Sequence, residues 1–127
     1  ANTGIGQAIA VGLARAGAHV VAASRRPADQ TLALLGPQGS ALVLDLADPM
    51  AAQDIFRAEA IDILVNNAGM IHRADSTEVT GADWDAVMRG NLDSVFFVGQ
   101  AVAQKMVARR RGRIVNIASI TAELPRP

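Results

Sequence analysis

The feature that most constrains the fold is the regular alternation of short apolar runs with helical segments. Apolar runs at 19–23, 41–44, 61–65 and 113–117 predict buried strands, because strands covered on both faces are apolar throughout. Helices are expected at 4–16, 29–35, 48–59 and 83–109 from their apolar spacing and their end signals. This order predicts an α/β fold, a Rossmann-like doubly wound parallel sheet with helices on both faces and right-handed crossovers.

The composition restricts the classes of partner. The 127 residues carry equal numbers of acidic and basic side chains, so no net field attracts nucleic acid or an anionic membrane. The absence of Cys excludes disulfides, thiolate metal sites and a Cys nucleophile, and it suits the cytoplasm. His19 and His72 have no partners at metal-ligand spacing, so no metal is expected.

Polar residues and glycines follow every predicted strand. Because ligands bind at the carboxyl ends of strands in such sheets, these segments are candidates for one site. Any one of them could be an ordinary polar loop, but all four together favour a ligand. They are Ser24-Arg25-Arg26, Asp45-Leu46, Asn66-Asn67-Ala68-Gly69 and Ser119.

The segment Gly4-Ile5-Gly6 opens the first helix and is a candidate phosphate site. Glycines let the backbone approach a pyrophosphate, and a helix N-terminus supplies N–H donors. The same pattern occurs in turns that bind nothing. Its position before an amphipathic helix and a buried strand favours phosphate binding here.

Asn91 lies inside an apolar stripe of the long predicted helix, between Met88 and Val95. A buried amide must be hydrogen-bonded or it costs about 1–3 kcal/mol. Asn91 could therefore be a structural residue with satisfied hydrogen bonds, or it could hold a water or a backbone group at a site. The residues alone leave both interpretations open.

Taken together, these segments resemble the short-chain dehydrogenase/reductase family over nearly the whole chain. Five of them match family motifs: the glycine turn Ala1–Gly6, Asp45-Leu46, the Asn-Asn-Ala-Gly sequence 66–69, Asn91-Leu92, and the strand ending at Ser119. The family's catalytic Tyr-x-x-x-Lys is absent. The resemblance thus implies that residues 1–127 are part of an NAD(P)-binding Rossmann domain, truncated at both ends, with the first strand and the C-terminal part missing.

The resemblance also implies a role for each matching residue. Ser119 and Asn91 would be catalytic, with Ser119 bonding the substrate oxygen and Asn91 holding a water of the proton relay. The cofactor-binding residues would be Gly4, Ile5 and Gly6 for the pyrophosphate, Asp45 and Leu46 for the adenine, and Asn67, Ala68 and Gly69 along the cleft.

The implied reaction is hydride transfer between a nicotinamide and a secondary alcohol or ketone. Segment 61–73 resembles the subgroup that acts on sugar acids such as 2-deoxy-D-gluconate or 2-dehydro-3-deoxy-D-gluconate, and His72 and Arg73 are candidates for contacting the substrate carboxylate. The family resemblance implies a homodimer or homotetramer. A non-catalytic nucleotide-binding module of the same fold is the alternative.

The residues that follow the predicted strand 19–23, which corresponds to the second strand of the family's fold, bear on the choice of cofactor. NAD-preferring sites usually carry a carboxylate there, whereas this chain has Ser24 followed by Arg25. A Ser does not repel a 2′-phosphate and an Arg can pair with it, so NADP is favoured over NAD. The alternative is that the Arg side chains only face solvent, and the resembled subgroup leans towards NAD.

Overall fold

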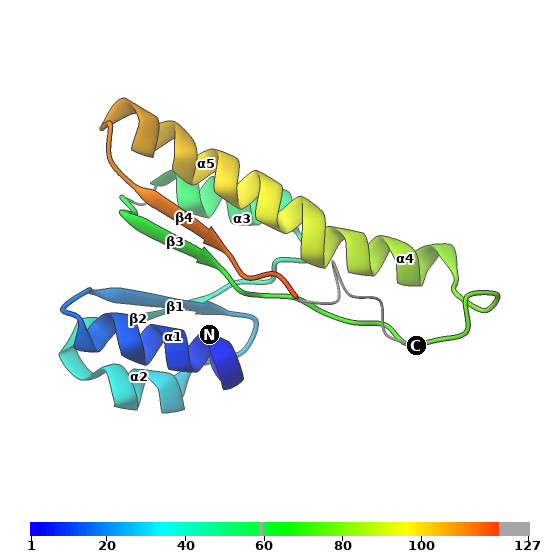
Figure 1. The fold of residues 1–127 in the computed structure, drawn as a ribbon, viewed down its shortest axis with the longest axis horizontal. Helices are drawn as coiled ribbons and strands as arrows, with labels where there is room; N and C mark the ends of the chain where they lie inside the picture. Colours follow the sequence, from blue (N-terminus) through cyan, green and yellow to red (C-terminus); the bar gives the residue numbers. More distant parts are fainter. Residues whose placement is uncertain (59, 120–127) are drawn as a thin grey trace.

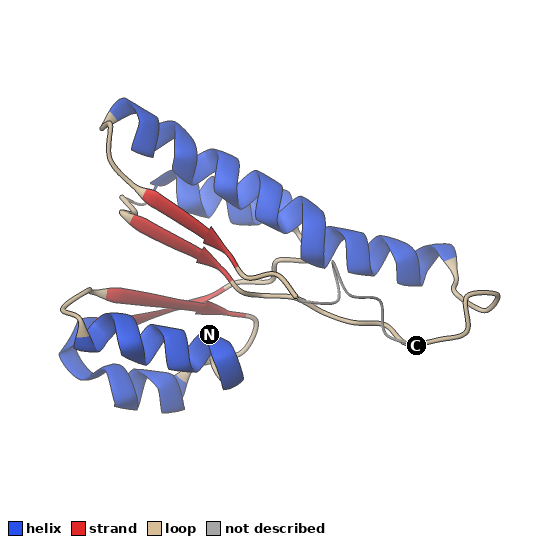
Figure 2. Cartoon of the chain, in the orientation of Figure 1, coloured by secondary structure: helices blue, strands red, loops and turns tan. Residues whose placement is uncertain are grey.

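Two pairs of parallel strands form the centre of the computed structural model, which describes residues 1–58 and 60–119. Strand β1 (Val20–Ser24) pairs with β2 (Gly39–Val43), with Ala22 opposite Ala41. Strand β3 (Ile63–Asn66) pairs with β4 (Arg113–Asn116), with Leu64 opposite Ile114. Figure 2 shows the arrowheads of β1, β3 and β4 pointing to the same side, and β2 runs parallel to β1, so the carboxyl ends of the strands share one edge.

The helices lie on opposite sides of the two strand pairs (Figure 1). Helices α1 (Gly4–Arg15) and α2 (Asp29–Leu35) cover β1 and β2, while α3 (Pro49–Ala58) and α5 (Ser94–Ala108) cover β3 and β4. Helix α4 (Gly81–Met88) extends beyond the strands, and a 3₁₀ turn follows α2 at Gly36–Gln38. The parallel strands with helices on both sides confirm the predicted Rossmann-like class.

The described residues form two apolar cores. The larger core joins α3, α5 and β3 and includes Leu44 directly after β2, with Ala23 of β1 and Leu42 of β2 packed against it. The smaller core lies between α1, α2 and β1. Burying a large apolar side chain stabilises the fold by about 1.5–3 kcal/mol, so the larger core dominates. Its buried members are Leu44, Ala52, Phe56, Leu64, Val98, Ala101, Val102 and Met106.

A cavity of about 800 Å³ separates the two strand pairs. The facing edges of β1 and β3 line it, through Val20, Val21 and Ala23 on one side and Ile63 and Val65 on the other. Neither edge pairs with another strand among the described residues. The strand expected before the glycine turn stays a prediction, and this cavity lies where two strands lack a neighbour.

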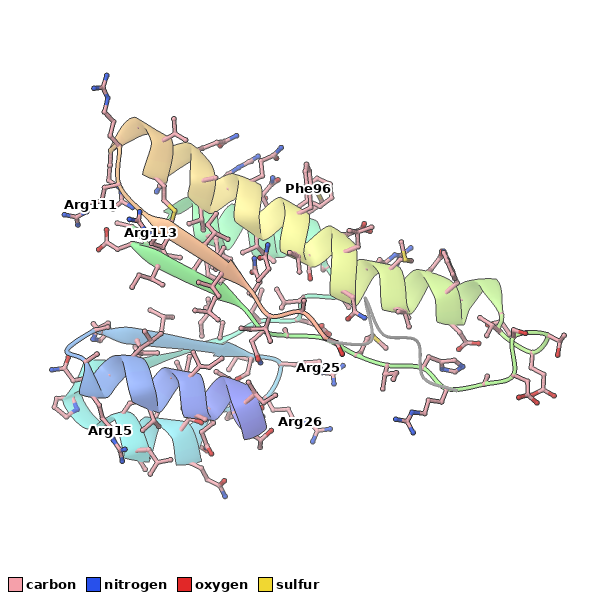
Figure 3. All side chains as sticks on the ribbon, in the orientation of Figure 1. Arg15, Arg25, Arg26, Phe96, Arg111 and Arg113 are labelled. Atoms are coloured by element: carbon pink, nitrogen blue, oxygen red, sulfur yellow. The ribbon has the colours of Figure 1, made fainter. Side chains whose placement is uncertain are left out.

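The long helix predicted over 83–109 is present at 81–108, where a π-helical segment at Arg89–Asp93 joins α4 to α5. The apolar stripe predicted along it, however, is partly wrong. Trp84, Leu92 and Phe96 are more than half exposed, and the buried face is formed by Val98, Val102 and Met106. Figure 3 shows Phe96 pointing away from α5 and the strands.

At the amino edge of the strands, arginines after α5 hold the start of β3. Arg109 donates to the backbone oxygen of Ile61 at 2.6 Å, and Arg111 contacts the Asp62 carboxylate at 2.9 Å. The hydrogen bond and charge of Arg111 lower the pKa of Asp62. These arginines, which suit the negative end of the α5 dipole, thus also anchor the segment before β3.

Candidate functional site

The glycine turn meets the end of β3 at the carboxyl edge. Gly6 is buried, and a Cβ atom placed on it would lie 2.7 Å from Asn67 Nδ2. Real Cβ atoms essentially never approach so closely, so any side chain at position 6 would force the Asn67 amide to shift. Two segments that the sequence separates by 60 residues are therefore brought together, as the prediction of one shared edge requires.

The start of α1 keeps its backbone donors uncapped. Gly4 has φ of +58°, which favours glycine. Thr3 occupies the N-cap position but its side chain makes no capping hydrogen bond. The first N–H groups of a helix have no partner within the helix, so this turn can accept an anion. Ile5 between the two glycines is exposed.

The turn is supported from behind by polar side chains that sequence analysis missed. The Thr31 hydroxyl on α2 donates to the backbone oxygen of Ala1 at 2.9 Å and accepts from Gln7 Nε2 at 3.0 Å. The only sequence signal was a Thr at a core-facing position of a short helix. Its partners lie 30 and 24 residues away, so no local pattern identified them.

The Asn-Asn-Ala-Gly segment connects three elements. The Asn66 side chain donates to Asn116 Oδ1 on β4 at 2.9 Å. Asn67 abuts Gly6, and an added Cβ on Gly69 would be 3.4 Å from Asn91 Oδ1. The segment thus lies between β4, the glycine turn and the π-helical segment. Asn116 was part of a predicted strand, but its side-chain role was not predicted.

Asn91 is bound to the backbone just beyond that segment. Its Oδ1 accepts from Met70 N–H at 2.8 Å, and its Nδ2 donates to Met70 O at 2.8 Å. Contrary to the predicted burial in an apolar stripe, Asn91 is exposed. Asn91 lies within the π-helical segment, where the helical period differs from the regular α-helical one that the prediction assumed. The Asn91 side chain thus accepts one hydrogen bond from the Met70 backbone and donates one to it, so it holds a backbone group rather than a water.

The ends of β1 and β2 carry the residues proposed to lie near the adenosine half of a dinucleotide. Ser24 Oγ donates to the backbone oxygen of Arg26 at 2.8 Å, so this hydroxyl fixes its own loop. Figure 3 shows Arg25 and Arg26 reaching out past the end of β1. Asp45 Oδ1 accepts from Ala47 N–H at 2.9 Å, and Leu46 lines the cavity between the strand pairs.

His72 and Arg73 lie on the loop that runs from the Asn-Asn-Ala-Gly segment towards α4. His72 Nδ1 is 3.7 Å from Asp83 Oδ1. Asp83 also forms a capping box with Thr80 at the start of α4, and the hydrogen bonds from Thr80 lower the pKa of Asp83. His72 is therefore drawn towards α4, while Arg73 is exposed.

Ser119 follows β4 at the carboxyl edge and is exposed. The hydrogen bond from Ile117 N–H to Asn66 O, at 2.9 Å, extends the pairing of β3 and β4 by one step. This hydrogen bond holds Ile117, two residues before Ser119, beside the Asn-Asn-Ala-Gly segment. Among residues 1–58 and 60–119, no cluster of three potential metal-binding side chains occurs, and no helix there is long and apolar enough to cross a membrane.

The contact of Asn91 with Met70 gives a testable expectation. Asn91→Leu removes both hydrogen bonds, each worth about 0.5–1.5 kcal/mol, so the Met70 amide should exchange with solvent about tenfold faster. Asn91→Asp keeps the oxygen that accepts from Met70 N–H and serves as the matched control. Hydrogen exchange measured by NMR checks this expectation. An unchanged exchange rate at Met70 in Asn91→Leu would show that the two hydrogen bonds between Asn91 and Met70 do not form in solution.

Comparison with known proteins agrees with this geometry. The family model for short chain dehydrogenases matches residues 1–127. Gluconate 5-dehydrogenase of Gluconobacter oxydans is 45% identical over 100% of this chain and 54% of its own length. The 2-dehydro-3-deoxy-D-gluconate 5-dehydrogenase of Bacillus subtilis is 39% identical over 94% of this chain and 50% of its own. The chain therefore spans about half the length of these relatives.

Solved structures give the same result. A structure from Agrobacterium tumefaciens with bound NADP, proposed to be a 2-deoxy-D-gluconate 3-dehydrogenase, is 53% identical with a TM-score of 0.92, over 98% of this chain and 52% of that one. A gluconate 5-dehydrogenase from Burkholderia cenocepacia, in complex with NADP and tartrate, is 43% identical with a TM-score of 0.83, over 99% and 53%. With the family model matched along its whole length, the chain belongs to the short chain dehydrogenase family.

Proposed function

We propose that the complete protein is an NAD(P)-dependent oxidoreductase that transfers hydride between a nicotinamide and a secondary alcohol or ketone of a sugar acid. The observation that carries this proposal is the meeting of Gly6 and Asn67 at the carboxyl edge, beside an uncapped helix start. The relatives named as gluconate and 2-dehydro-3-deoxy-D-gluconate dehydrogenases support the substrate class. Because those relatives are dehydrogenases, they lend no support to the non-catalytic alternative.

The residues of this chain would bind and orient the reactants. The bound nicotinamide cofactor supplies the hydride chemistry. The backbone at Gly4, Ile5 and Gly6 would hold its pyrophosphate through uncapped N–H groups, which favour anions at a helix start. Asp45 and Leu46 would contact the adenine, and the Asn67-Ala68-Gly69 backbone would line the cleft, where the lack of large side chains leaves room for a flat ring.

Asn91 would act on the proton relay through its backbone rather than its side chain. Met70 already occupies the amide oxygen and one donor of the amide nitrogen, at 2.8 Å each. The π-helical segment has the i→i+5 hydrogen-bond pattern in place of the usual i→i+4 pattern. A backbone carbonyl of this segment would hold the water that the family resemblance assigned to Asn91.

Ser119 would hydrogen-bond the substrate oxygen. Ser119→Ala in the full-length protein should lower kcat about 10²–10³-fold, the usual loss for one donor to a developing oxyanion, while the Kd for NADP stays within about twofold. Steady-state kinetics and calorimetric titration measure the two effects. Ser40, which bonds His19 at the opposite edge, supplies the control variant Ser40→Ala; turnover unchanged in Ser119→Ala would remove Ser119 from the mechanism.

NADP is the proposed preferred cofactor, because no carboxylate follows β1 to repel a 2′-phosphate and Arg25 can pair with one. Three structures of relatives are described with NADP bound. Arg25→Ala should lower kcat/KM for NADP about tenfold and leave that for NAD nearly unchanged. Arg15→Ala is the control, since Figure 3 places Arg15 away from Arg25. A wild type that prefers NAD, with no response to losing Arg25, would contradict the assignment.

Arg73 would recognise the carboxylate of a sugar acid, supported by its exposure on the loop after Gly69 and by the tartrate in the Burkholderia relative. Arg73→Ala should raise KM for a keto-sugar acid about tenfold and change KM for a neutral ketone little, since only the acid carries the paired charge. His72→Ala is a poor test, because His72 pairs with Asp83. Equal effects of Arg73→Ala on both substrates would reject carboxylate recognition.

The exposed face of α4 and α5 would bind a second copy of the protein. Trp84, Leu92 and Phe96 recur at helical spacing on that face and are 61%, 54% and 58% exposed. Exposed apolar stripes of this kind are typical of interfaces. Phe96→Asp should therefore lower the mass found by sedimentation, whereas Val107→Asp, at the far end of α5, should not. A wild type that sediments as a monomer would contradict this.

A further inference from the structure

Helix α2 contains a hydroxyl group in a position where packing alone requires none. Thr31 is 0% exposed and shares the inward face of α2 with the buried side chains of Ala28 and Leu35. An apolar side chain such as Val has almost the same shape and would fit that face. The hydroxyl therefore needs a separate explanation.

The hydroxyl uses both its donor and its acceptor on the glycine turn. Oγ1 donates to the backbone oxygen of Ala1 at 2.9 Å and accepts from Gln7 Nε2 at 3.0 Å. Gln7 Nε2 also lies 3.5 Å from the backbone oxygen of Asn2. Thr31 is thus connected to the residues just before and just after the two glycines.

Other supports of the turn are few in the described part of the chain. The backbone nitrogen of Ala1 donates to Ala23 O on β1, and Asn67 packs against Gly6. The Thr3 side chain makes no capping bond, and Gly4 has the flexible backbone of a glycine at positive φ. Within the described part of the chain, the side chains that hydrogen-bond to residues 1–3 are those of Gln7 and Thr31.

We propose that Thr31 is a positioning residue that holds the glycine turn in the conformation able to accept a dinucleotide pyrophosphate. This inference rests on the proposed function of the turn. The hydroxyl does not contact the ligand; it fixes the carbonyl of Ala1 and the side chain of Gln7, so that the N–H groups at Gly4–Gly6 are directed outward before the ligand arrives. Preorganisation of this kind raises affinity by lowering the cost of ordering the loop on binding.

The test compares Thr31→Val, which removes the hydroxyl, with Thr31→Ser, which keeps it, in the full-length protein. Thr31→Val should raise the Kd and KM for NADP about tenfold, the effect of losing roughly 1.4 kcal/mol of buried hydrogen bonding, with kcat at saturating NADP unchanged. Thr31→Ser should restore the wild-type Kd to within about twofold. Binding of adenosine 2′-monophosphate, which lacks the pyrophosphate, should change little in either variant.

Several outcomes would overturn the inference. One is a Thr31→Val protein that binds NADP as the wild type does; another is an equal loss for adenosine 2′-monophosphate, which would show a general effect on the domain. A third is a Thr31→Ser variant as weak as Thr31→Val, since the methyl group and not the hydroxyl would then be responsible. A wild type that binds neither NADP nor NAD would instead refute the proposed function.

If Thr31→Val does not fold, Gln7→Leu tests the same contact from the other side. Gln7 is only partly buried and donates to the Thr31 hydroxyl, so its loss leaves α2 intact. The Kd for NADP should rise about threefold, in line with one lost hydrogen bond. An unchanged Kd in Gln7→Leu would overturn the inference.

Discussion

The close fit of Gly6 against the Asn67 amide is the contact on which the site depends. The two strand pairs share no hydrogen-bonded ladder, and a cavity of about 800 Å³ lies between them. At the carboxyl edge, however, the turn that begins α1 and the segment that ends β3 touch directly. This contact places a helix start with free donors next to a flat, small-residue segment, and neither half of the chain has both.

The segment 66–70 connects that contact to β4 and to the π-helical segment on the opposite side of the site. Asn66 is tied to Asn116 on β4, and Met70 is held by Asn91 at the π-helical segment. An added Cβ on Gly90 would lie 3.2 Å from the Met70 side chain, so the helix also packs closely there. The glycine turn and the strand leading to Ser119 are thus connected through five consecutive residues. The Asn66 and Asn91 bonds are all between neutral amide groups.

Local patterns predicted the elements well because each depends on residues close in sequence. Apolar runs predicted four parallel strands, and Gly4 and Gly6 predicted the turn; the strand bounds differ from those predicted by at most two residues. The environment of Asn91 was predicted wrongly, because helical spacing does not distinguish a face packed on the core from a face left exposed, and it does not reveal a π-helical segment. The hydrogen bonds of the Thr31 and Asn116 side chains were not predicted, because their partners lie 30 and 50 residues away in the sequence.

The most direct test of this account is NADP binding by the full-length protein and by two glycine variants. In Gly6→Ala the new methyl group would displace the Asn67 amide, whereas Gly12→Ala on the same helix adds a methyl group with nothing within 4 Å. Calorimetric titration should show wild-type and Gly12→Ala proteins binding alike, and Gly6→Ala binding at least about tenfold more weakly while its unfolding temperature stays close to that of Gly12→Ala. Equal binding by all three proteins, or no binding by the wild type, would contradict the claim that this contact forms a dinucleotide site.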